Sequence, residues 1–132
     1  MEPKARTAAP IDAPPLASVE GAIDLAHLAR MTLGERSLEA EVLALFDQQA
    51  AVLLAHMREA APQAVAAFAH TLKGSARGIG AWRVAAAAEA VEIDAARANA
   101  GEFAGALARL AAAVAEARAA IAARAQPHAC SG

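Results

Sequence analysis

The sequence of 132 residues contains little cysteine, few aromatic residues and no long apolar segment free of charge. The single cysteine, Cys130, cannot form a disulfide within the chain, so a reducing cytoplasm is the expected compartment. The most alanine-rich block, residues 104–125, is interrupted by Arg109, Glu116 and further charges. Such a block is not typical of a membrane-spanning helix, and we expect no membrane partner.

Neither sign of charge dominates. Twelve Lys and Arg residues face fourteen Asp and Glu residues, which gives a formal net charge of −2. This balance provides no basic field that would attract nucleic acid, so no nucleic-acid partner is expected. Ser37 and Ser75 have no evident His and Asp partners for hydrolase chemistry. The His and Cys residues lack the spacing of a metal site, and the chain has no glycine-rich nucleotide loop. We therefore expect neither a bound metal nor autonomous kinase activity.

The composition favours helices. Hydrophobic residues make up 58% of the chain, and most of them are alanine and leucine, which are good helix formers. The proline-containing residues 1–20 are predicted to form a disordered arm, and residues 126–132 a flexible tail. Asp24 is a plausible N-cap for a short helix that ends near Leu33-Gly34, with the glycine at the C′ position.

Four longer helices are predicted to follow, joined by short connections. We place the first at about 35–58, the second from Pro62 to about 77, and the third at about 81–98. The segment 99–101, Asn-Ala-Gly, is predicted as a stop before the last helix. The expected fold is all-α: an antiparallel up-and-down four-helix bundle with a short extra N-terminal helix, spanning residues 21–125.

Helical spacing predicts which faces are buried. In the first long helix the predicted stripe contains Leu38, Val42, Leu45, Phe46, Gln49, Leu53 and Met57. In the last helix it contains Phe103, Leu107, Leu110, Val114 and Ile121. Trp82, the only tryptophan, begins the third long helix and is expected to pack at one end of the bundle.

The second long helix carries an unusual stretch, AHTLKGSA, at residues 69–76. Its apolar residues fall on one arc, and at roughly 100° per residue His70 lies about 150° from the centre of that arc. Lys73, Gly74 and Arg77 share this outward side, at i+3, i+4 and i+7 from the histidine. A glycine inside a helix costs about 1 kcal/mol relative to alanine, and here it lies opposite the buried face.

An outward imidazole with a cation and a bare backbone beside it fits a nucleophile that a second macromolecule must reach. An imidazole nitrogen can accept a phosphoryl group covalently. Phosphoryl transfer requires positioning and neutralisation of oxygen charge, which Lys73 would supply. Gly74 would leave room for the partner's active site to close over His70. No carboxylate adjoins His70 in the sequence, which suits a relay whose partner supplies the carboxylates and the metal.

At these residues the sequence resembles the histidine-containing phosphotransfer (HPt) domains of multistep phosphorelays. The family signature is a histidine, two residues, Lys-Gly and a small residue, which residues 70–76 match. The similarity continues into a following helix with Glu89 and Glu92 and back over residues 24–46. The resemblance implies that His70 is the phosphoacceptor, Lys73 its electrostatic partner and Gly74 the clearance position.

The resemblance also implies the partners. They would be response-regulator receiver domains, which carry Mg²⁺ of their own, and a hybrid histidine kinase. The chain itself would need no cofactor, would not act as a kinase and would be a monomer. Arg77, one turn beyond Lys73, is a further candidate for partner docking. The main alternative is a non-transferring helical-bundle adaptor that docks a signalling partner on the same surface.

Overall fold

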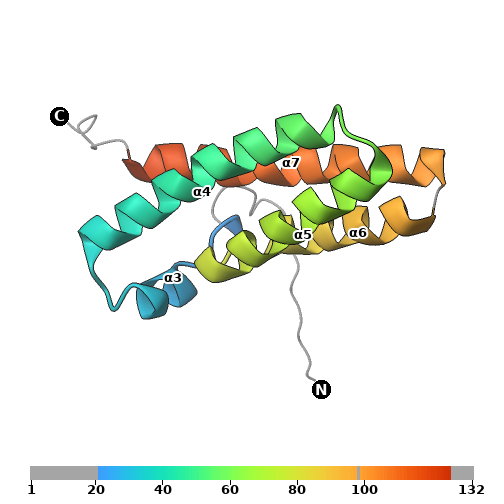
Figure 1. Ribbon diagram of the computed structural model, residues 1–132. Helices are drawn as coiled ribbons and strands as arrows, with labels where there is room; N and C mark the ends of the chain where they lie inside the picture. Colours follow the sequence, from blue (N-terminus) through green and yellow to red (C-terminus); the bar gives the residue numbers. More distant parts are fainter. Residues whose placement is uncertain (1–20, 98, 126–132) are drawn as a thin grey trace, which may run out of the picture.

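The computed structural model describes residues 21–97 and 99–125, which form five helices within these ranges (Figure 1). They are α3 (Leu25–Met31), α4 (Arg36–Met57), α5 (Pro62–Ile79), α6 (Trp82–Arg97) and α7 (Ala100–Ala125). The four long helices run up and down in sequence order, and α7 returns to pack against α4 as well as α6. The predicted all-α bundle with a short N-terminal helix is confirmed. The predicted arm and tail lie outside the described residues.

The short helix α3 begins at the predicted cap. The Asp24 side chain accepts a hydrogen bond from the His27 backbone N–H at 3.1 Å. At the other end, Leu33 rather than glycine occupies the C′ position, because Leu33 N–H donates to Arg30 O and Gly34 N–H donates to Ala29 O. Glycine therefore lies one residue later than predicted.

The first long helix, α4, buries Phe46 and Met57 as predicted, but the rest of its buried face is shifted from the predicted stripe. Leu38 and Leu45 are exposed, and Val42 and Leu53 are only partly buried. The buried positions are Glu39, Leu43, Phe46, Ala50, Leu54 and Met57. Apolar residues occur on both faces of this helix, so spacing alone could not identify the face that enters the core.

Helix α5 begins with Pro62 in its first turn, as predicted, and extends two residues beyond the expected end at about 77. Gly78 does not break it. The helix ends at Gly80, whose φ of +83° is left-handed and whose backbone N–H donates to carbonyls of the last turn. Asp24 approaches so closely that a Cβ at position 80 would lie 2.9 Å from the Asp24 carbonyl oxygen. Glycine is required there for two reasons.

The predicted stop at 99–101 instead begins the last helix. The Asn99 side chain accepts a hydrogen bond from the Glu102 backbone N–H at 3.0 Å, as an N-cap residue does. Helix α7 accordingly includes Ala100 and Gly101.

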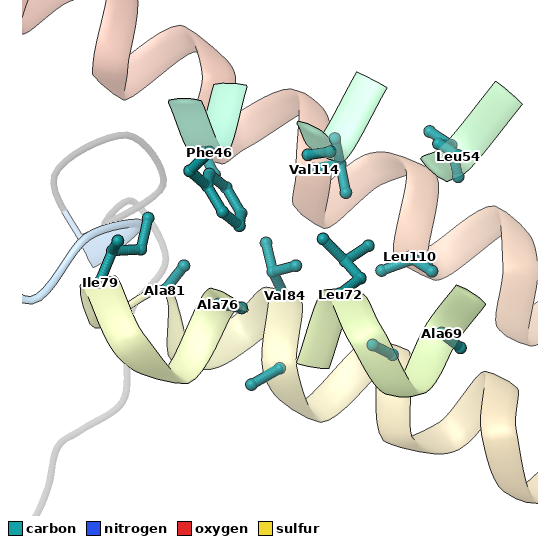
Figure 2. Close-up of a cluster of buried hydrophobic side chains, with 14 of the residues drawn as sticks. Phe46, Leu54, Ala69, Leu72, Ala76, Ile79, Ala81, Val84, Leu110 and Val114 are labelled. Carbon is teal, nitrogen blue, oxygen red and sulfur yellow. The ribbon is translucent and has the colours of Figure 1, made fainter. Parts of the chain in front are cut away.

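Helices α5 and α6 have the most extensive contact of the helix pairs, and their buried residues are mainly alanine and valine. Figure 2 shows small side chains such as Ala69 and Ala76 of α5 opposite larger ones such as Phe46 of α4 and Leu110 of α7. Such close approach holds α5 firmly against α6, so that residues on their outward edges can meet.

At one end of the bundle, Trp82 contacts the α3 end of the chain as expected, but it remains 44% exposed. Its indole N–H donates to Asp24 Oδ2 at 2.9 Å, and its ring meets His27 edge-on at a centroid distance of 4.9 Å. The Asp24 backbone N–H also donates to the Gly80 carbonyl at 2.9 Å. These contacts fix α3 beside the C-terminal end of α5 (Figure 1).

Candidate functional site

The stretch 69–76 lies in the middle of α5, with its apolar arc in the core as predicted. Val65, Ala69, Leu72, Ala76 and Ile79 are buried. His70 points away from them, and its side chain is 67% exposed. The most reactive side chain of this stretch is therefore presented to solvent by a helix whose other face is fixed in the core.

A carboxylate that is distant in sequence contacts this histidine. Glu92 of α6 places Oε2 2.9 Å from His70 Nδ1. A carboxylate oxygen can only accept, so Nδ1 carries the proton and donates it. In the neutral ring, Nε2 is then left with a free lone pair. The contact both orients the ring and determines which nitrogen can act as a nucleophile.

Lys73 also binds this carboxylate. Its Nζ lies 3.0 Å from Glu92 Oε1, and its side chain is only 14% exposed. The prediction that Lys73 shares the solvent side with His70 is therefore wrong in part. Its position on α5 faces α6, and the ammonium extends to the carboxylate there. The three side chains form one cluster, in which His70 and Lys73 each contact a different oxygen of the Glu92 carboxylate.

The pKa of Glu92 reflects this cluster. The ion pair with Lys73 is the main cause of a pKa below the ordinary value of 4.5, partial burial opposes it, and the His70 hydrogen bond adds to the lowering. Glu92 is thus ionised at neutral pH and can stabilise positive charge on the His70 ring.

Gly74 lies one turn after His70 on the outward side. A Cβ added there would meet no atom of the described part of the chain within 4 Å. Packing within the bundle therefore does not require this glycine, as the sequence predicted. A Cβ added at Gly78 would likewise meet no neighbouring atom within 4 Å. Over the two turns after His70, this side of α5 therefore carries two glycines, which have no side chains to project from the helix.

Arg77 is exposed and lies 3.8 Å from Glu89 of α6, which is a loose surface ion pair. It does not join the cluster of His70, Lys73 and Glu92. Beside the outward side of α5, a groove runs between α3, α4 and α5. It is lined by Leu28, Met31, Thr32, Leu38, Val42, Phe46, Gln49, Ser75, Gly78 and Ile79.

Within residues 21–97 and 99–125, no group of three or more His, Cys, Asp or Glu side chains could hold a metal ion. In the same ranges no helix is long and apolar enough to cross a membrane.

Fold and site together define a helical bundle that presents a histidine oriented by a carboxylate. Residues 41–120 match the model of the Hpt domain family, and the match spans more than half of the chain. The chain belongs to this family, which gives it a phosphotransfer role in phosphorelays. It is also similar in fold to the X-ray structure of a rice protein assigned as a histidine-containing phosphotransfer protein, with 19% identity, a TM-score of 0.70 and 82% of each chain covered. A search of curated proteins found no match.

The sequence predicted roles for His70, Lys73 and Gly74, and the structure places all three in the middle of α5. The sequence did not assign a role to Glu92, although that residue lies in the helix that the family resemblance includes. The signal was an acid in the helix after the motif, but its pairing depends on how α5 and α6 align.

Proposed function

We propose that this protein relays a phosphoryl group between aspartates of response-regulator receiver domains through Nε2 of His70. The observation that carries the proposal is the hydrogen bond from His70 Nδ1 to Glu92, which leaves Nε2 with a free lone pair on a side chain that is 67% exposed. The family relation supports phosphotransfer in general.

In the proposed step, the Nε2 lone pair attacks the phosphorus of the receiver's aspartyl phosphate. The N–P bond forms, the P–O bond to the aspartate carboxylate breaks, and that carboxylate leaves with the electron pair. The Nδ1 proton stays on the ring, so the phosphorylated imidazole is cationic. Glu92 stabilises this charge across 2.9 Å, and the reverse sequence passes the group to the next receiver.

Lys73 serves as the cation of the site. It balances Glu92 before transfer, and rotation about its side-chain bonds brings Nζ toward the phosphoryl oxygens afterwards. Gly74 keeps the surface beside His70 low, so the partner's active site can close over the ring. Arg77, which is exposed beside this surface, would contact the partner.

The chain would carry no cofactor, because a receiver domain supplies Mg²⁺ with its own carboxylates, and a hybrid histidine kinase would supply the phosphate. We expect a cytoplasmic monomer that acts as an intermediate and not as a kinase. The apolar groove beside α5 gives a receiver additional surface to bind.

The alternative is an adaptor that docks the same partner without transfer. The His70–Glu92 contact favours transfer, since docking alone does not need a ring held in one tautomer.

The test is labelling by a receiver domain phosphorylated in the presence of Mg²⁺. One acid-labile, base-stable phosphate is expected on the wild-type protein, and none on His70→Gln. The variant should keep its helicity and melting temperature, because an outward residue contributes little to the core. Label that persists on the variant, or a wild-type protein that binds receivers without being labelled, would show that the proposal is wrong.

A further inference from the structure

The turn between α5 and α6 is short. Only Gly80 and Ala81 separate Ile79, the last residue of α5, from Trp82, the first residue of α6. The Ala81 backbone N–H donates to the Ala76 carbonyl at 2.8 Å, which closes the turn against the end of α5. Two antiparallel helices joined by so short a link have few arrangements open to them. The conformation of this turn is therefore one determinant of which residues of α5 and α6 lie side by side.

Asp24, which precedes α3, contacts the turn with both its backbone and its side chain. Its backbone N–H donates to the Gly80 carbonyl at 2.9 Å, and its Oδ2 accepts from the Trp82 indole N–H at 2.9 Å. Asp24 is itself held in place, because Ile23 before it and Leu28 of α3 after it are buried. It therefore ties the carbonyl of the turn and the first side chain of α6 to a fixed point of the bundle.

The contact between His70 and Glu92 lies at matching distances from this turn. His70 precedes Gly80 by ten residues and Glu92 follows Trp82 by ten, so each is about 15 Å along its helix from the turn. Displacing α6 by one residue would move Glu92 by about 1.5 Å and rotate it by about 100°. Such a change would break the 2.9 Å hydrogen bond. The contact thus depends on the alignment to which the turn contributes.

We infer that Asp24 is a positioning residue for phosphoryl transfer: by holding the α5–α6 turn, it keeps Glu92 in contact with His70. For the reaction itself, the inference rests on the proposed function. Within residues 21–97 and 99–125, no hydrogen bond or ion pair joins Asp24 to His70 or Glu92, so its effect passes through the turn.

The test uses Asp24→Ala, which removes the side-chain hydrogen bonds and leaves the backbone bond to Gly80. The variant should fold, because Ile23 and Leu28 stay buried. Nitrogen-15 NMR of the histidine rings in the unphosphorylated protein reports the state of His70 directly. The wild type should show the proton on Nδ1, and the His70 signals of Asp24→Ala should move toward those of Glu92→Ala, in which the contact is absent.

Transfer kinetics provide a second readout. With a saturating phosphorylated receiver, single-turnover transfer by Asp24→Ala should slow about two- to fivefold, while the receiver concentration that gives half the maximal rate stays within about twofold of wild type. In the Glu92→Ala background, adding Asp24→Ala should cause no further loss, because a positioning residue has no effect once the group that it positions is absent.

Two substitutions separate positioning from general loosening of the bundle. Asp47→Ala is the matched control, since it removes a 2.7 Å hydrogen bond between α4 and Arg118 of α7, away from the turn. It should leave the His70 signals and the rate unchanged. Asp24→Asn keeps one acceptor oxygen, so its His70 signals and its rate should lie between those of wild type and Asp24→Ala.

The inference is overturned if the His70 signals of Asp24→Ala match those of wild type, if Asp47→Ala shifts them equally, or if Asp24→Ala slows transfer by the same factor with and without Glu92. The NMR measurement needs no phosphate. A wild-type protein that no receiver labels would therefore refute the proposed function, while the effect of Asp24 on the His70–Glu92 contact is still decided by the NMR spectra.

Discussion

Replacing Glu92 by glutamine tests how the site activates His70. Glutamine keeps the length of the side chain and an oxygen that can accept from His70 Nδ1, but it removes the charge. Two unit charges about 4 Å apart attract by about 4 kcal/mol at an effective dielectric near 20. Glu92 is 29% exposed and shares its charge with Lys73, so we expect about 1–2 kcal/mol of this to act on the cationic ring. Glu92→Gln should therefore slow transfer about 5- to 30-fold.

The assay is single-turnover transfer from a saturating phosphorylated receiver, so that docking does not limit the rate. Glu92→Ala should be slower than Glu92→Gln, because it also loses the acceptor that holds Nδ1–H in place. Glu116→Gln is the control, since Glu116 pairs with Arg83 at 2.8 Å on another part of the bundle and its loss changes the net charge equally. A Glu92→Gln variant as fast as wild type would refute the assignment of Glu92.

Three further predictions concern other residues of the site and of the fold. Gly74→Ala in α5 and Gly105→Ala in α7 should each stabilise their helix by up to about 1 kcal/mol, because an added Cβ meets no close neighbour at either position, but only Gly74→Ala should slow transfer; equal rates in stopped-flow measurements would contradict the clearance role. Lys73→Met should slow transfer by roughly tenfold to a hundredfold, equivalent to about 1.4–2.8 kcal/mol, and Lys73→Arg should retain most of the rate; a Met variant at the wild-type rate would exclude an electrostatic role. The hydrogen bond from Trp82 is the main cause that lowers the pKa of Asp24 below 3.8, so the ionised Asp24 stabilises the fold above that pH and this stabilisation is lost as the pH falls through the lowered pKa. The free energy of unfolding in urea should therefore differ between wild type and Asp24→Asn at pH 7, and the difference should disappear in strong acid. A difference that does not depend on pH would contradict this prediction.

The fold was predictable because its signals are local. Asp24 and Pro62 each mark a helix start by their own chemistry, and both begin their helices as predicted. The buried face of α4 was not predictable, because Leu43 and Leu45 fit apolar stripes on two faces and only packing against α5 and α7 selects Leu43. The sequence predicts Asn99 as a stop, but the same side chain caps the following helix.

The candidate residues on α5 could be proposed from the sequence, whereas their contact with Glu92 on α6 could not. His70, Lys73 and Gly74 stand out because their spacing on α5 is legible from the sequence. Glu92 lies 22 residues after His70, and its contact depends on the axial alignment of α5 and α6. The same alignment directs Lys73 to a carboxylate rather than to solvent. Long-range alignment of this kind comes from core packing, which a single sequence does not display.

The central claim is that Nε2 of His70 carries the phosphoryl group while Glu92 holds Nδ1. Nitrogen-15 and phosphorus-31 NMR of the phosphorylated protein, labelled in its histidine rings, measures the coupling between phosphorus and each ring nitrogen directly. The account predicts a single phosphohistidine with phosphorus coupled to Nε2 and the proton retained on Nδ1. Phosphorus on Nδ1, or on any residue other than His70, would contradict it.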